Sequence, residues 1–201
     1  PEQAPDHAGL VPQDGFRLMF AGNIGESQDF DTLVAAAALL REREDLHWVI
    51  VGSGRDGERV KRLVAENGLE ERFHFLGRHP EEEMPKFFAH ADAMLVRLKD
   101  IPIFALTVPY KTQSYMACGK PIIASLNGEG ARIVNESGAG IAVAATQPQA
   151  LANAIATMMD AGPARRQSYA ASSRKYFEMN YSADKVYAAL EHALASVARN
   201  R

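Results

Sequence analysis

The sequence contains very little cysteine, and neither sign of charge dominates it. Its single cysteine, Cys118, can form neither an internal disulfide nor a thiolate metal cluster, so the fold must depend on its apolar core. The formal net charge of -3 provides no broad cationic surface for nucleic acid or for an anionic membrane. We therefore expect no nucleic-acid partner and a reducing compartment, the cytoplasm, as the location of the protein.

The chain also lacks any apolar run long enough to cross a membrane. The longest, 33–40, has eight residues and is mostly alanine, whereas a span needs roughly 18. The sequence starts at Pro1 without an initiator methionine or a basic and then apolar leader, which indicates a fragment of a longer protein. Residues 1–14 are rich in proline and show no periodicity, so we expect a linker there.

From Phe16 onward, short β-branched or aromatic runs alternate with longer segments of helical spacing, which is typical of βαβ units. The expected strands are 16–21, 47–51, 73–76, 93–96, 121–125 and 141–143. The expected helices are 27–41, 58–67, 81–90, a short one ending at 118, 129–136, 147–160, 163–177 and 182–198. This pattern predicts an α/β fold, a doubly wound, mainly parallel six-stranded Rossmann-like sheet with extra C-terminal helices. One domain would cover 15–180, followed by a C-terminal helix within 181–201.

The common strand order 3-2-1-4-5-6 reverses between strands one and four, and ligands bind in the crevice that opens there. The expected crevice loops are 22–28 and 97–111. In the first of them, Gly22 and Gly25 allow backbone to approach a ligand, and a helix start offers N–H groups to an anion. The simpler interpretation is that strand-to-helix turns favour glycine and asparagine in any case.

Two other patterns point to chemistry less strongly. Residues 52–57 match G-x-G-x-x-G, but they follow the second strand, and Gly77 and Arg78 stand where a ribose-binding acid belongs in a dinucleotide site. A tight turn on the crevice rim, including Gly54, is favoured. Asp29 and Asp31 fall in an expected first helical turn, and the six histidines lack zinc-helix spacing, so we expect no metal site.

The segment 108–121 is the most informative one in the chain. Pro109 suits a helix start, while Gly119 and Pro121 suit its end. Lys111 then falls in the first helical turn, where a cation is unfavourable unless an anion or an acidic neighbour lies close to it. A solvated lysine is the alternative. Cys118 is most simply a small packed residue.

Five ordered segments carry a family resemblance, and several motifs together are far more specific than one. They are FAGNIG at 20–25 with Gln28, VIVGSG at 49–54, FLGR at 75–78, ADA at 91–93 and YMACGKPII at 115–123. The chain thereby resembles, over about 15–180, the C-terminal half of retaining GT-B glycosyltransferases of family 4. The similarity is greatest to bacterial enzymes that build O-antigen, capsule or colanic acid.

The resemblance implies a nucleotide-sugar donor domain that needs no cofactor and binds a nucleoside diphosphate sugar. We expect this sugar to be linked to UDP. The residues implied at the diphosphate are Gly22, Asn23, Gly25, Gln28 and catalytic Lys111. Gly54 would lie on the rim of the crevice. Arg78 would lie where the backbone contacts the nucleobase.

The family's paired glutamates would align with Ser114, at the ribose, and with about Leu106, at the hexose. Both acids are missing here. Glu129 could supply a catalytic carboxylate instead, or it could simply be an acid stabilised at a helix N-terminus.

In such enzymes the acceptor binds in the first half, so the resemblance implies a missing N-terminal acceptor domain of the same polypeptide. We expect this chain alone to fold, to bind a nucleoside diphosphate weakly and to transfer nothing. The whole protein would glycosylate a lipopolysaccharide, capsule or exopolysaccharide acceptor. A peripheral association with the inner face of the cytoplasmic membrane would occur through the missing half. Tyr176, Phe177 and Tyr181 would be exposed where that half is absent.

Two other functions stay open on the residues themselves. An NAD(P)-dependent oxidoreductase would bind NADH, and a non-catalytic interaction domain would bind no nucleotide. Fold alone separates none of the three.

Overall fold

The computed structural model describes residues 7–199 and has a six-stranded sheet at its centre. All five strand pairs are parallel, and the order is β3-β2-β1-β4-β5-β6, as the sequence predicts. The strands are β1 (Phe16–Ala21), β2 (Leu46–Val51), β3 (Phe73–Gly77), β4 (Ala93–Arg97), β5 (Ile122–Ser125) and β6 (Gly140–Val143). The predicted fold class is confirmed.

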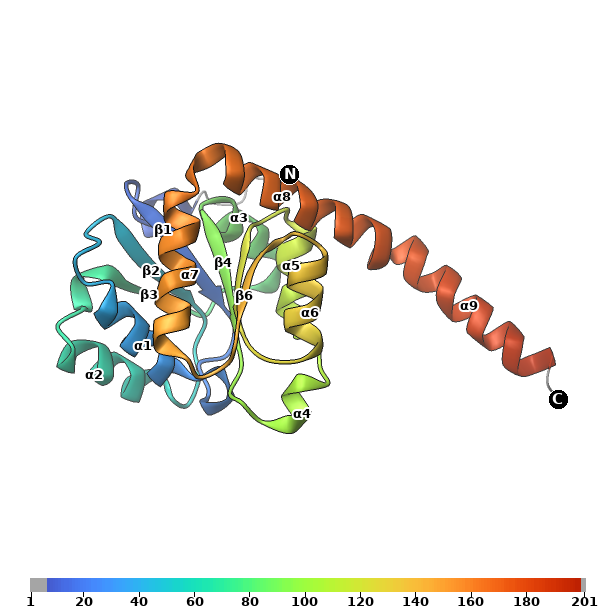
Figure 1. Cartoon of the computed structure of the whole chain (residues 1–201), viewed down its shortest axis with the longest axis horizontal. Helices are drawn as coiled ribbons and strands as arrows, with labels where there is room; N and C mark the ends of the chain where they lie inside the picture. The colour runs from blue at the N-terminus through green and yellow to red at the C-terminus, as the bar shows by residue number, and fades with distance from the viewer. Residues whose placement is uncertain (1–6, 200–201) are drawn as a thin grey trace.

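Helices cover both faces of this sheet (Figure 1). The α-helices are α1 (Phe30–Leu39), α2 (Gly57–Glu66), α3 (Met84–Ala89), α4 (Pro102–Ala105), α5 (Tyr110–Ala117), α6 (Glu129–Glu136), α7 (Pro148–Asp160), α8 (Gly162–Asn180) and α9 (Ala183–Arg199). Four short 3-10 helices join them: η1 (His7–Leu10), η2 (Glu26–Gln28), η3 (Glu70–Arg72) and η4 (Glu81–Glu83).

Each face of the sheet has its own apolar layer. Alternate strand residues pack with α1, α2 and α7 on one side, where Trp48 stacks on Phe73 at 5.4 Å between ring centroids. The other strand residues pack with α3, α5 and α6, including fully buried Phe87 and Met116. Strands buried on both faces explain the nearly continuous apolar runs in the sequence.

Strands β1 and β4 separate at the point where the crevice is expected. β1 pairs with β2 along its whole length from Phe16 to Ala21, but its pairs with β4 within the described residues are Leu18 with Ala93 and Met19 with Met94. The backbone of Ala21 bonds instead to the buried hydroxyl of Tyr115 in α5. That hydroxyl accepts from the Ala21 N–H at 3.0 Å and donates to the Ala21 carbonyl at 3.1 Å.

The first helix differs from the expected span 27–41. It begins at Phe30, because η2 ends at Gln28 and Asp29 has a left-handed conformation with φ of 49°. The guanidinium of Arg97 donates to the Asp29 carbonyl at 2.5 Å, a long-range contact that sequence spacing does not reveal. The loop 22–28 therefore ends in a single 3-10 turn, η2, and does not continue directly into α1.

Two further segments also differ from the expectation. The four-residue helix α4 lies in a stretch expected to be irregular. A helix of this length is too short to show helical periodicity in the sequence. Helix α8 continues to Asn180, beyond the expected end at 177.

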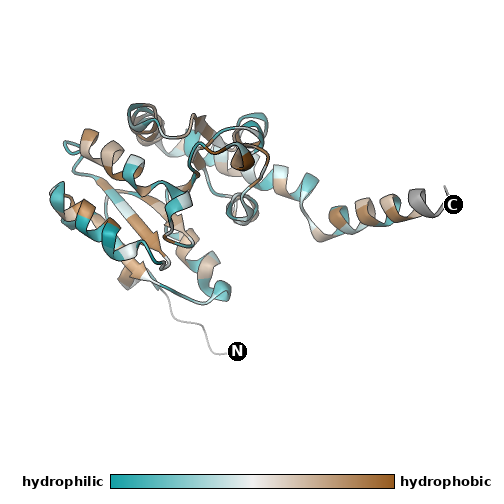
Figure 2. Ribbon diagram, turned by 90° about the horizontal axis from the view of Figure 1, so that it is seen from below, coloured by the Kyte–Doolittle hydropathy of each residue, from teal (hydrophilic) through white to brown (hydrophobic). Residues whose placement is uncertain are grey.

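The expected exposure of Tyr176, Phe177 and Tyr181 is wrong. All three are partly buried against the apolar layer of α5 and α6, because α8 packs along α5 of its own domain. Exposed large apolar side chains lie at other places, among them α9, which projects away from the domain (Figures 1 and 2). Those on α9 are Val186, Tyr187, Leu190 and Leu194.

Residues 1–6 of the expected linker lie outside the described residues. The part that follows packs on the domain: Val11 is buried, and buried His7 stacks on Phe87 at 4.0 Å between ring centroids. Among residues 7–199, no helix combines the length and the apolarity needed to cross a membrane.

Candidate functional site

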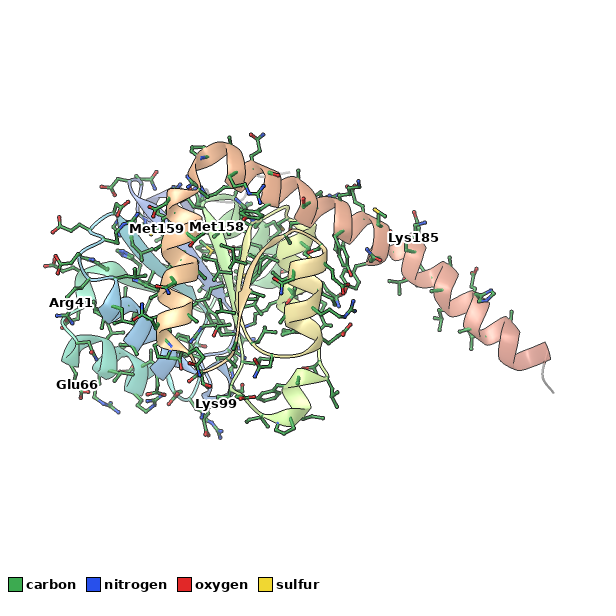
Figure 3. All side chains as sticks on the ribbon, viewed as in Figure 1. Arg41, Glu66, Lys99, Met158, Met159 and Lys185 are labelled. Atoms are coloured by element: carbon green, nitrogen blue, oxygen red, sulfur yellow. The ribbon has the colours of Figure 1, made fainter. Side chains whose placement is uncertain are left out.

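The loops after the parallel strands meet at one edge of the sheet. Lys99, just after β4, lies at this edge beside α4, whereas Met158 and Met159 of α7 lie toward the opposite edge (Figure 3). Lys99 ties two of these loops together, because its backbone N–H donates to the Ser27 carbonyl at 2.9 Å. Its ammonium group forms an ion pair with Glu26 at 2.9 Å.

Backbone hydrogen bonds join the loops after β1 and β2. The N–H of Gly22 donates to the Val51 carbonyl at 2.9 Å, and the N–H of Ile24 donates to the Ser53 carbonyl at 3.0 Å. These two N–H groups are therefore directed toward the neighbouring loop rather than toward a ligand.

The glycines of residues 52–57 serve this junction. A Cβ at Gly52 would lie 1.9 Å from the Gly22 carbonyl oxygen, and one at Gly54 would lie 2.2 Å from the Ile24 carbonyl oxygen. Neither position can hold a side chain without moving backbone. The G-x-G-x-x-G match thus has a packing explanation, as the preference for a rim turn anticipated.

The side chain of Lys111 lies across the loop 22–28. Its ammonium nitrogen donates to Gln28 Oε1 at 2.7 Å and lies 3.1 Å from the place of a Cβ on Gly22. It also lies 4.0 Å from the ring centroid of Phe20. The two segments expected to frame the crevice therefore meet, with a cation between them.

A second cation lies beneath this contact. Arg97, at the end of β4, is 1% exposed, and its guanidinium carbon is 4.7 Å from the ring centroid of Phe30. Burial lowers the pKa of Arg97 to about 9. Burial, together with the charge of Arg97, lowers the pKa of Lys111 to about 7.

Two adjoining cavities open on either side of Gly22. One, the loop cavity, has a volume of about 770 Å³ and is lined by the loops after β1, β2 and β3, including Asn23, Gly54 and Arg78. The other, the helix cavity, has about 560 Å³ and is lined by α3 and α5, including Lys111 and Ser114. Gly22, Glu81 and Met84 line both cavities. Each volume is in the range of small-molecule sites.

Most of the residues expected at the site lie here. Gly22, Asn23, Gly54 and Arg78 line the loop cavity, Lys111 and Ser114 line the helix cavity, and Gln28 holds Lys111. Gly25 lines a neighbouring hollow of about 500 Å³ together with Arg55 and Lys99.

Glu129 lies elsewhere. It forms ion pairs with Arg132 at the start of α6, and this arginine lowers the pKa of the Glu129 carboxyl. It does not line either cavity of the described region.

Three residues of this region do not follow from the sequence pattern: Arg97, Tyr115 and Glu81. An arginine inside the apolar run of 93–98 is a usable signal, because charge in a buried strand is rare. The hydroxyl of Tyr115 and the position of Glu81 depend on contacts between elements. The described residues contain no cluster of three or more His, Cys, Asp or Glu placed to hold a metal ion.

Residues 15–161 match the family model described as "Glycosyl transferases group 1". The chain belongs to this family. A relative in Salinispora tropica, named D-inositol 3-phosphate glycosyltransferase, is 27% identical over 87% of this chain and 37% of its own length. A relative in Mycolicibacterium smegmatis, named GDP-mannose-dependent alpha-(1-6)-phosphatidylinositol monomannoside mannosyltransferase, is 30% identical over 73% of this chain and 39% of its own length.

Solved structures share the fold. A glycosyltransferase from Rickettsia africae superimposes with a TM-score of 0.81 at 18% identity, over 95% of this chain and 50% of that one. HepE of Anabaena in complex with UDP gives 0.77 at 19% identity, over 96% and 54%. The chain thus spans about two-fifths of the curated relatives and about half of these structures.

Proposed function

We propose that this chain is the donor-binding half of a retaining GT-B glycosyltransferase of family 4. Its donor would be a nucleoside diphosphate sugar, with UDP as the nucleotide. The observation that carries this proposal is the ammonium group of Lys111, which lies over Gly22 where the two cavities join. Family membership and the UDP in the HepE complex support the donor class.

The diphosphate would lie beside Lys111. Departure of a nucleoside diphosphate develops negative charge on its phosphate oxygens, and fixed positive groups stabilise that charge. Lys111 lies in the first turn of α5, at the end of the helix that carries partial positive charge. The helix dipole and the ammonium group then act together without a metal ion.

The nucleoside would extend from Lys111 toward Arg78. Ser114 and Glu81 both line the helix cavity, and Glu81 also reaches the loop cavity. A carboxylate can accept hydrogen bonds from two vicinal hydroxyl groups, whereas the Ser114 hydroxyl offers a single donor. We therefore assign the ribose to Glu81 and Ser114 together, and the nucleobase to the loop that contains Arg78.

The acceptor would be a cell-surface polysaccharide or its precursor, held by a second domain that completes the protein. This part of the proposal depends on the sequence resemblance alone. The names of the two relatives give other acceptors, an inositol phosphate and a phosphatidylinositol mannoside. The enzyme would work in the cytoplasm, at the membrane face where such precursors are assembled. Residues 15–180 would form the donor domain.

The test is titration of the purified 201-residue chain with UDP, GDP and NADH. UDP is expected to bind best, and Lys111→Ala is expected to weaken it at least tenfold. Lys185→Ala is the matched control, because Lys185 lies on the projecting helix α9 (Figure 3). Preferential binding of NADH would favour an oxidoreductase, and no nucleotide binding would favour an interaction domain.

A further inference from the structure

The crevice contains a buried arginine, Arg97, and a partly buried lysine, Lys111, with little to balance a positive charge on both. The Arg97 guanidinium donates to the Asp29 carbonyl, while its Nε and Nη2 atoms have no hydrogen-bond partner among the described residues. Burial lowers the pKa of this group, but an arginine keeps its proton in proteins, so Arg97 is a positive charge under the crevice floor.

Lys111 meets the same aromatic ring as Arg97. The Phe20 centroid is 4.0 Å from the Lys111 ammonium nitrogen and 5.9 Å from the Arg97 guanidinium carbon. The attraction of an ammonium group to a ring is smaller than the cost of taking an ion out of water. A lysine that is largely desolvated can escape that cost by releasing its proton, whereas an arginine cannot.

The other charged or titratable groups around Lys111 do not supply a counter-ion. The hydroxyl of Tyr115 and the thiol of Cys118, both in the helix cavity, have pKa values raised by burial and are neutral. Tyr110 is exposed on the same wall. Glu81 is exposed at the junction of the two cavities. Beneath the crevice, Asp29 and Asp31 act on Arg97, and Asp31 is itself paired with Arg59.

We propose that, above neutral pH, Lys111 is mainly neutral in the empty site and takes up a proton when a diphosphate binds, and that Arg97 is the positioning residue that keeps it mainly neutral until then. This inference rests on the proposed function. The proton passes from the buffer to Lys111 Nζ, where one N–H bond forms and no other bond changes. The resulting ammonium group donates to the phosphate oxygens, whose charge favours the protonated form.

The experiment is calorimetric titration of the 201-residue chain with UDP at pH 8 in two buffers that differ in ionisation enthalpy. With a pKa of about 7 in the free chain, uptake of about 0.9 proton per UDP is expected. Affinity should fall by up to about 50-fold from pH 7 to pH 9 as the free lysine loses its proton. The UDP phosphate is already ionised there, since its second pKa is about 6.

Two variants separate this linkage from a general pH effect. Lys111→Arg keeps a permanent charge, so proton uptake should vanish and affinity should become nearly independent of pH. Arg97→Gln keeps an amide donor for the Asp29 carbonyl but removes the charge, so the pH of half-maximal uptake should move upward. Arg97→Lys is its control and should move it less.

The outcomes distinguish failure of this inference from failure of the proposed function. UDP binding without proton uptake between pH 7 and pH 9 would overturn the inference and leave the donor site in place. Uptake that persists in Lys111→Arg would also overturn it, and would point to another group such as His79 of the loop cavity. Absence of UDP and GDP binding at every pH would overturn both proposals.

Discussion

Replacing Tyr115 by phenylalanine removes one buried hydroxyl and leaves the ring in place. The ring is 0% exposed and meets Phe88 edge to face, at 5.1 Å between centroids, so packing is retained. The Ala21 N–H and carbonyl both lose their partner at the point where β1 and β4 have separated. Each unsatisfied buried group costs about 1–3 kcal/mol, so we expect the two together to cost roughly 2–6 kcal/mol.

Urea unfolding, followed by the fluorescence of Trp48, measures this loss. The midpoint should fall while the slope stays unchanged, because the surface exposed on unfolding is the same. The melting temperature should drop by roughly 4–24 °C. Tyr110→Phe is the matched control, since Tyr110 is 71% exposed and loses the same hydroxyl. Equal midpoints for the two variants would refute the reasoning.

Three further predictions follow from the packing. Gly52→Ala should destabilise the chain by about 2 kcal/mol or more and weaken UDP binding, since its Cβ would overlap the Gly22 carbonyl; a thermal scan with normal unfolding would contradict this. Glu129→Gln should leave UDP affinity of the chain within twofold, because Glu129 pairs with Arg132 and does not line the cavities; a tenfold loss in a titration would place its carboxylate at the donor. Deletion of 183–201 should leave the unfolding midpoint unchanged, because α9 contacts mainly α8; a broad, uncooperative transition would show that α9 stabilises the domain.

The sequence predicts the sheet well because each strand is a local signal. Apolar runs between glycine-rich turns locate the strands to within one or two residues, and the known switch-point rule then places the crevice loops. The helix that carries Lys111 is also correct, since Pro109 and Gly119 mark its limits.

The details that the sequence does not predict depend on contacts between distant residues. The late start of α1 follows from the bond of Arg97 to Asp29, which lies 68 residues earlier. Tyr176 and Phe177 are partly buried because α8 packs on its own domain. The sequence-based expectation had reserved these side chains for contact with a second domain. Within the loop 22–28, which the sequence places at the crevice, the N–H groups of Gly22 and Ile24 bond to the neighbouring loop, and local spacing cannot show this.

The junction of the loops after β1 and β2 has a consequence for substrate choice. Main-chain atoms of Gly22, Ile24, Val51 and Ser53 form it, and its two close approaches involve hydrogen atoms on Gly52 and Gly54. Other residues that line the loop cavity, such as Arg78 and His79, take no part in this junction. In the donor site proposed above, exchanging them would change the nucleotide preference while the backbone junction keeps its shape, so engineering of donor preference would begin at 78–81.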